Sequence, residues 1–293
     1  MTVRSLEASG QLPQRRSPRA QTFRRFSRNM TGMVGLVLVL FIVVLALGAP
    51  LFTGADPKAI DTTVILQPPS LDHWFGTDDL GRDVFSRVLY GARISILIGL
   101  AVAAITTVTG MTLGLLAGFY PRLDNPIMRA MDVLMAFPTI LLALGIVAIL
   151  GPQLINIVIA LVVPYTPTTA RLVRGLVLQL KGSEFITAAH SVGVKNHRII
   201  THHLLPNSVS VVIVRQTYVL ATAILAEAAL TFLGVGVPPD VPTLGGIMSS
   251  ARSHMRVAAW LSLYPGVAIS LLVLGFNLLG DGLRDVLDPR MKI

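Results

Sequence analysis

Hydrophobic residues gather in six long runs along this chain, and polar residues occupy the stretches between them. The runs cover residues 31–53, 91–119, 129–150, 153–174, 208–233 and 259–280. A helix of about 20 mostly apolar residues crosses a bilayer, and each run is about that long or longer. The pattern predicts an all-α integral membrane protein with about six transmembrane helices.

The run 153–174 departs most from this pattern. Two prolines and four tyrosine or threonine side chains interrupt it (Pro164, Pro167, Tyr165, Thr166, Thr168 and Thr169). Proline is tolerated in a membrane helix where neighbouring helices or water satisfy the freed backbone groups. We therefore count this run as a span.

The composition supports a membrane protein. Of the 293 residues, 53% are hydrophobic and 13% are charged, whereas a soluble domain carries about 25% charged residues. The chain has no cysteine, which excludes a disulfide framework, a thiolate metal site and a cysteine nucleophile.

The 24 lysines and arginines are distributed unevenly between the two sides of the predicted bundle. With the N-terminus inside, 17 of them lie in inner segments, seven of these in the tail 1–30. Only five lie in outer loops: Lys58, Arg82, Arg87, Arg252 and Arg256. Basic residues favour the cytoplasmic side, so both termini and residues 175–207 are expected in the cytoplasm of a cell-membrane protein. The basic tail is then a topology signal, the first run is expected to be an uncleaved anchor, and no nucleic-acid partner is expected.

The first outer loop, residues 54–90, is rich in aspartate. Its segment GTDDLGRDVF does not have the spacing of a calcium-binding loop. We expect these carboxylates to form solvated turns and helix caps, and we expect no metal site.

Three glycines in the second run are spaced four residues apart, at Gly110, Gly114 and Gly118. On a helix this spacing places them on one face, where small residues let another helix backbone approach closely. They predict a helix-packing seam inside the bundle.

Three ionisable residues lie within the apolar runs, and such residues usually face protein or a water-filled path. Asp132 and Arg215 are near the predicted inner ends of their runs, where a long side chain can reach the interface. Glu227 lies deeper, and the sequence leaves open whether it is a structural hydrogen-bond anchor or lines a path.

Residues 183–207, SEFITAAHSVGVKNHRIITHHLLPN, predict two short helices in the cytoplasm. Ser183 suits an N-cap and Gly193 suits a left-handed helix end. Small or apolar residues recur on one side of each helix (Phe185, Ala188, Ala189 and Val192; Ile199, Ile200 and His203). Pro206 is expected to stop the second helix before the run 208–233.

This hairpin resembles the "EAA" loop of permease subunits in ABC importers, which carries two alanines, a glycine four residues on and a Leu-Pro pair thirteen after the glycine. The matching residues are Ala188, Ala189, Gly193, Leu205 and Pro206. The usual glutamate before the alanines is Thr187 here, and Glu184 is the acidic residue instead, as in the peptide-importer branch.

Three more stretches, HWFGTDDLGRDVFSRVLYGARISILIGL (73–100), AEAALTFLGVGVPP (226–239) and FNLLGDGLRDVLDPR (276–290), resemble C-type dipeptide/oligopeptide permeases. The resemblance covers residues from about 30 to 290.

The resemblance implies a type I ABC importer transmembrane domain over residues 91–280, with a cytoplasmic tail at 281–293. It also implies a second homologous permease, two cytoplasmic ATPase domains that bind ATP and magnesium, and an extracytoplasmic peptide-binding protein. The loop at 183–207, through Glu184 and the matched residues, would couple the ATPases to the bundle. The chain contains no G-x-x-x-x-G-K-[ST] motif, so we expect no ATP hydrolysis, no catalytic residue and no cofactor in this chain.

Two other functions remain open. An intramembrane hydrolase needs a histidine base at membrane depth, and all six histidines fall in or beside predicted loops. A stand-alone secondary transporter would leave the hairpin without a role. Dipeptides or oligopeptides are the expected substrates, with nickel, glutathione and haem as alternatives within the same family.

Overall fold

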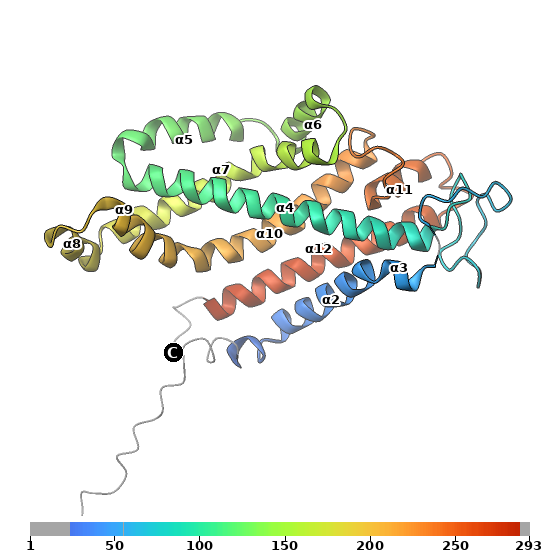
Figure 1. The fold of residues 1–293 in the computed structure, drawn as a ribbon, viewed down its shortest axis with the longest axis horizontal. Coiled ribbons are helices and arrows are strands. Elements are labelled where there is room, and N and C mark those ends of the chain that lie inside the picture. The colour runs from blue at the N-terminus through green and yellow to red at the C-terminus, as the bar shows by residue number, and fades with distance from the viewer. Residues whose placement is uncertain (1–23, 55, 288–293) are drawn as a thin grey trace, which may run out of the picture.

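The structure is a computed structural model that describes residues 24–54 and 56–287, and helices dominate it (Figure 1). The described part of the chain forms no β-strand, only an isolated bridge between Thr77 and Asp83. Its helices are α2 (Met30–Leu47), α3 (Ala49–Phe52), α4 (Val84–Phe119), α5 (Pro121–Met135), α6 (Thr139–Leu150), α7 (Leu154–Lys181), α8 (Glu184–Ser191), α9 (Asn196–Ile199), the π-helix η1 (Ile200–Leu204), α10 (Leu205–Phe232), α11 (Leu244–Ala251) and α12 (Trp260–Leu287).

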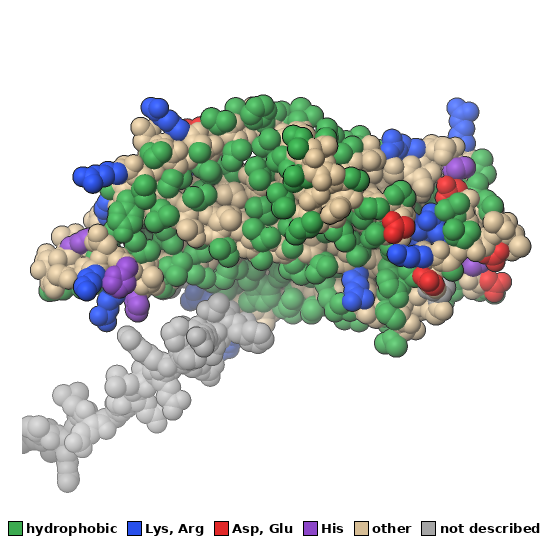
Figure 2. Space-filling view, turned by 45° about the horizontal axis from the view of Figure 1, so that its top comes forward, with side chains coloured by type: hydrophobic (Ala, Val, Ile, Leu, Met, Phe, Trp, Pro, Cys, Tyr) green, Lys and Arg blue, Asp and Glu red, His purple; other side chains and the backbone are tan. Residues whose placement is uncertain are grey.

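Five long helical stretches follow the long axis of the molecule (Figure 1). They are α2, α4, α7, α12 and the continuous stretch Asn196–Phe232, each long and apolar enough to cross a membrane. Figure 2 shows hydrophobic side chains over the middle of the visible face and most of the charged and histidine side chains toward its two ends. Large apolar side chains point outward from α2, such as Val37, Phe41 and Val44. Contact of these apolar side chains with lipid is favourable, whereas their exposure to water would be unfavourable.

The predicted span 129–150 is wrong as a single helix. The chain instead forms α5 and α6, which meet at an angle of 90° across a short break. Pro138, at the N-cap of α6, explains the break, because proline disfavours a helical conformation in the residue before it. Helix α5 is also amphipathic, with only Met131 buried, so it lies against the bundle on one side only.

Helix α4 begins at Val84, within the predicted outer segment 54–90. Asp83 caps this helix: its Oδ2 accepts a hydrogen bond from the backbone N of Ser86 at 2.8 Å. The 36 residues of α4 extend over about 54 Å, compared with a hydrocarbon core of about 30 Å. Part of α4 therefore lies beyond the bilayer core.

Helix α4 packs most closely against α7, and the three glycines lie at this contact. A Cβ at Gly110 would lie 2.6 Å from Thr169 Cβ, and one at Gly114 would lie 2.6 Å from the carbonyl oxygen of Ala170. A Cβ at Gly118 would meet Val177 at 2.7 Å. The absence of side chains at these positions lets the two backbones approach each other.

Candidate functional site

The polar hairpin forms one end of the molecule, where α8 and α9 lie (Figure 1). Ser183 has an extended backbone at the N-cap of α8, but its hydroxyl donates to Leu180 O and makes no cap hydrogen bond. Glu184 follows in the first turn, where its negative charge interacts favourably with the positive end of the helix dipole. Helix α8 thus begins at the predicted residue by a different local contact.

Gly193 ends the first helix with a φ of +76°, a left-handed conformation that glycine adopts without the penalty of a Cβ. The backbone N–H groups of Gly193 and Val194 donate to the carbonyl oxygens of His190 and Ala189, at 3.0 and 3.1 Å. The space around Gly193 is open, with no atom within 4 Å of an added Cβ. The turn therefore depends on the backbone conformation rather than on close packing.

The expected stop at Pro206 is wrong. Helix α9, the π-helix η1 and α10 follow one another without a loop, and Pro206 lies in the first turn of α10. Proline has no N–H to donate, and a π-type turn directly before it accommodates the changed hydrogen bonding. Leu205, just before the proline, is half-buried. The hairpin is thus joined to the membrane bundle by continuous helix.

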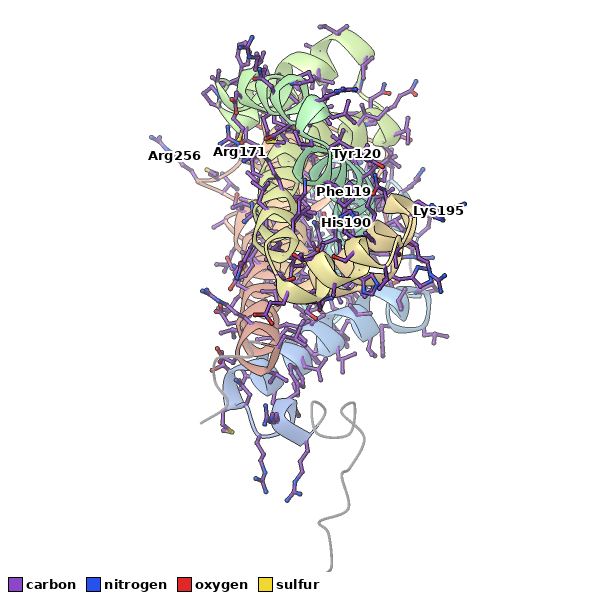
Figure 3. The ribbon with its side chains drawn as sticks, turned by 90° about the vertical axis from the view of Figure 1, so that its left-hand side faces the viewer. Phe119, Tyr120, Arg171, His190, Lys195 and Arg256 are labelled. Atoms are coloured by element: carbon purple, nitrogen blue, oxygen red, sulfur yellow. The ribbon has the colours of Figure 1, made fainter. Side chains whose placement is uncertain are left out.

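Three buried residues anchor the hairpin to the bundle: Ile186 from α8, Ile199 from α9 and Leu204 from η1. They share a hydrophobic cluster with Phe119 of α4 and Val177 of α7. Figure 3 labels His190 close to Phe119, and their ring centroids are 6.3 Å apart. The hairpin therefore packs against the ends of α4 and α7 instead of hanging free.

The opposite side of α8 is open. Glu184 and Ala188 are exposed, Ala189 is half-buried, and Val192 is 80% exposed. Phe185 is also exposed, beside His203. A small, partly apolar face that projects from an anchored helix can receive a rigid partner.

The polar residues Asp132 and Arg215 both contact α7. Asp132 of α5 accepts a hydrogen bond from Arg171, and Arg215 of α10 donates to Thr168 Oγ1 at 2.9 Å. A second ion pair that the sequence did not reveal joins α5 to α7, between Asp124 and Arg174, with Nη2 2.6 Å from Oδ2. These contacts hold α5 and α10 against α7.

Glu227 is 0% exposed, in the interior between α4 and α10. Ser95 Oγ donates to Glu227 Oε2 at 2.8 Å and Thr231 Oγ1 donates to Oε1 at 3.1 Å. In the part of the chain that the structure describes, no basic side chain forms an ion pair with it. This geometry is that of a hydrogen-bond anchor between two helices.

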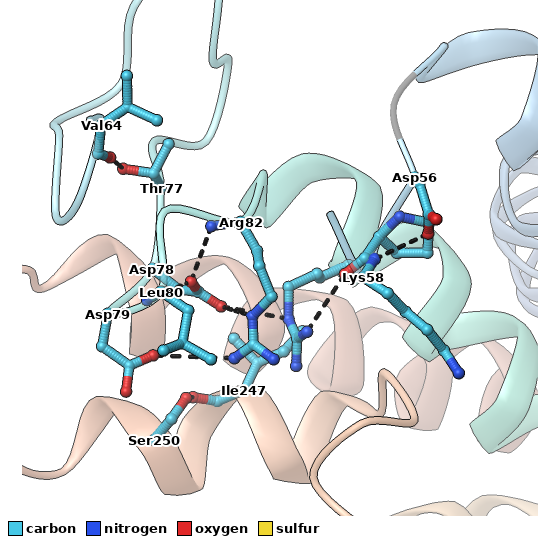
Figure 4. A network of polar contacts seen from close by, with 12 residues as sticks. Asp56, Lys58, Val64, Thr77, Asp78, Asp79, Leu80, Arg82, Ile247 and Ser250 are labelled. Carbon is cyan, nitrogen blue, oxygen red and sulfur yellow. Dashed lines mark hydrogen bonds and ion pairs between the residues drawn. The ribbon is translucent and has the colours of Figure 1, made fainter. Parts of the chain in front are cut away.

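A charged cluster at the other end of the molecule was not predicted from the sequence (Figure 4). Asp78 is buried and accepts hydrogen bonds from the backbone N–H groups of Leu80 and Arg82 and from Arg82 Nε. Arg87 Nε lies 3.5 Å from Asp78 Oδ2. From the sequence, the aspartate spacing predicted only turns. The contacts of Arg82 and Arg87 with Asp78 depend on how the loop folds, so the sequence pattern did not reveal them.

Other aspartates of this loop take part in turns. Asp61 Oδ1 accepts hydrogen bonds from the hydroxyl and the backbone N–H of Thr63, and these bonds lower the pKa of Asp61. Asp83 caps α4 and lies 3.1 Å from His73 Nδ1. Within the described residues, no three such side chains are arranged to hold a metal ion.

Comparison with known proteins decides the family. Residues 110–293 match the family described as binding-protein-dependent transport system inner membrane component. The chain belongs to this family. Residues 17–69 also match the N-terminal transmembrane domain of oligopeptide transport permease C. The resemblance stated from the hairpin and the C-type stretches is confirmed.

Relatives match over nearly the whole chain. The dipeptide transport system permease protein DppC of Alkalihalophilus pseudofirmus is 47% identical over 277 residues, which cover 94% of this chain and 91% of the relative. The glutathione transport system permease protein GsiD of Pectobacterium atrosepticum is 42% identical, with coverage of 94% and 93%. The chain is therefore an ABC importer permease of the oligopeptide and dipeptide type, and ATP hydrolysis belongs to partner subunits.

A solved structure shares the fold. A chain of the MetNI methionine ABC transporter, in an inward-facing conformation, aligns with a TM-score of 0.59 at 20% identity. The alignment covers 69% of this chain and 97% of that chain. The all-α importer fold expected from the sequence is confirmed.

Proposed function

We propose that this permease forms half of the translocation path of an ATP-driven importer for dipeptides or short oligopeptides. A second, homologous permease completes the path in the lipid bilayer. Two cytoplasmic ATPase domains bind ATP and magnesium, and an extracytoplasmic binding protein delivers the peptide. The near full-length similarity to a permease named for dipeptide transport supports this substrate class.

The hairpin couples the ATPases to the membrane bundle in this proposal. The observation that supports this role is the anchored helix α8, which has an open face around Ala188. A continuous helical stretch from Asn196 to Phe232 follows it. A displacement imposed on α8 by the ATPases is transmitted through packed side chains and rigid helix to the bundle. A solvated linker would need neither the buried Ile186 nor the helical connection to α10.

The orientation follows from the basic residues: both termini and the hairpin are cytoplasmic, and the loop before α4 is extracytoplasmic. Glutathione is a second candidate substrate, because a relative of 42% identity is named for its transport. Transport that depends on an ion gradient instead of ATP would indicate a secondary transporter.

The test uses the cysteine-free sequence. Ala188→Cys adds a single thiol on the open face of α8, and Val257→Cys adds one at an exposed site outside the hairpin. After mild-detergent isolation from native membranes, a bifunctional thiol–amine cross-linker is applied and partners are identified by mass spectrometry.

The proposal expects a second permease, a peptide-binding protein and a P-loop ATPase among the partners, with the ATPase cross-linked to Ala188→Cys and not to Val257→Cys. Isolation of the chain without any ATPase would refute ATP-driven import. Equal cross-linking of both variants to the ATPase would refute the role of the hairpin.

A further inference from the structure

A cavity of about 390 Å³ lies near the end of the bundle opposite the hairpin. Its walls come from four parts of the chain: residues 82–87, Pro152, residues 231–239 and α11. Pockets that bind small molecules have volumes of about 300–1,000 Å³. This cavity is therefore large enough for one or two amino-acid residues.

Two arginines, Arg82 and Arg87, are among the residues that line the cavity. Both residues are buried, and Arg87 is only 3% exposed. A guanidinium has five N–H donors, yet each makes only one hydrogen bond among the described residues. Arg82 Nε donates to Asp78 at 2.7 Å, and Arg87 Nη1 donates to Pro57 O at 3.3 Å. Arg87 Nε is buried and makes no hydrogen bond, although it lies 3.5 Å from Asp78 Oδ2 in an ion pair.

The nearby carboxylates do not use up these donors. Asp78 already accepts three hydrogen bonds, two of them from backbone N–H groups. Asp79 Oδ1 is 3.8 Å from Arg82 Nη2, which is beyond hydrogen-bond distance. Asp78 and Asp79 balance the formal charges of Arg82 and Arg87, so a bound carboxylate would depend on the unused N–H donors and not on a net positive charge.

Helix α11 adds a hydroxyl group that can accept a hydrogen bond, whereas the arginines can only donate. Ser250 lines the same cavity as Arg82, and both are labelled in Figure 4. Ser250 Oγ donates to the carbonyl oxygen of Ile247 at 2.9 Å, which leaves the oxygen lone pairs free to accept. The cavity thus offers cationic donors and an acceptor.

We propose that this cavity binds the C-terminal residue of a short peptide. Arg82 and Arg87 hold its carboxylate through charge-assisted hydrogen bonds, and Ser250 Oγ accepts its backbone N–H. The inference rests on the proposed peptide import, and it assigns the end of the substrate that this subunit recognises at the extracytoplasmic mouth.

The test measures ligand binding to the purified full-length chain in lipid nanodiscs, without any binding protein. The probes are L-alanyl-L-alanine, its C-terminal amide and acetate, observed by saturation-transfer NMR. We expect the dipeptide to bind, acetate to compete with it, and the amide to bind about tenfold more weakly or not at all.

Two variants address the site and one serves as control. Arg87→Lys keeps the charge but loses the planar donors, and Ser250→Leu fills the cavity while leaving the charged residues in place; each should lower dipeptide affinity about tenfold or more. Arg256→Gln changes an exposed arginine that projects away from the bundle (Figure 3) and should bind as the parent does.

Equal binding of dipeptide and amide would overturn the proposal, as would unchanged affinity in both Arg87→Lys and Ser250→Leu. Acetate binding without dipeptide binding would also overturn it. If the cross-linking experiment proposed above recovers the ATPase, any of these results would leave the proposed import intact.

Discussion

At the residue scale, Gly193 combines a left-handed backbone with open surroundings. Asparagine and aspartate both tolerate this conformation, so Gly193→Asn and Gly193→Asp have the same shape and differ in charge. We expect Gly193→Asp to insert normally but to lose most ATP-driven uptake, because a charge is added beside the docking face of α8. Uptake of radiolabelled dipeptide, normalised to the amount of permease in the membrane, measures the effect. Gly193→Asn is the control, and wild-type uptake by Gly193→Asp would contradict the coupling role of the turn.

Glu227 is a second single residue whose surroundings lead to a test of its role. It accepts hydrogen bonds from Ser95 and Thr231. In Glu227→Gln both hydroxyls can rotate to keep their partners, whereas in Glu227→Leu they are left unsatisfied, at a cost of about 1–3 kcal/mol each. We therefore expect Glu227→Gln to keep the thermal stability of the detergent-solubilised complex and Glu227→Leu to lower it. Loss of uptake in a stable Glu227→Gln would indicate instead that the carboxylate itself serves the path.

At the element scale, the contact of α4 with α7 depends on the absence of side chains. A side chain at Gly114 would overlap the backbone of α7, since even its Cβ would lie 2.6 Å from Ala170 O. Overpacking of this kind costs about 1–3 kcal/mol and occasionally more. Gly114→Leu should therefore reduce the melting temperature and the membrane level. Gly175→Leu, on α7 but facing open space, is the matched control, and equal stability of the two variants would contradict the seam.

The elements also show how far the sequence determines the fold. The long apolar runs and the conformation of Gly193 were predictable, because both depend on local properties of a few adjacent residues. The break at Pro138 and the helical continuation through Pro206 were not. Pro138 lies at the break between α5 and α6, whereas Pro206 lies in the first turn of α10, directly after a π-helix. The contacts of Arg87 with Pro57 and Asp78 depend on how a long loop folds, which residue spacing does not determine.

At the scale of the whole molecule, the two candidate sites lie at opposite ends of one bundle. Helix α10 connects them: it continues from the hairpin at one end and reaches Thr231, which lines the cavity, at the other. Its buried Glu227 ties it to α4 near the cavity end. A displacement at the hairpin can thus reach the cavity along a single rigid element, provided that the two ends face opposite sides of the membrane.

This orientation gives the last prediction. Val192 is 80% exposed in the hairpin, and Val257 is 69% exposed in another part of the chain, between α11 and α12. In the cysteine-free chain, Val192→Cys and Val257→Cys each introduce one thiol. Because basic residues gather on the hairpin side, a membrane-impermeant maleimide should label Val257→Cys in intact spheroplasts and Val192→Cys only after permeabilisation. The reverse pattern would place the hairpin outside, beyond the reach of cytoplasmic ATPases, and would remove the basis for ATP-driven coupling through α8.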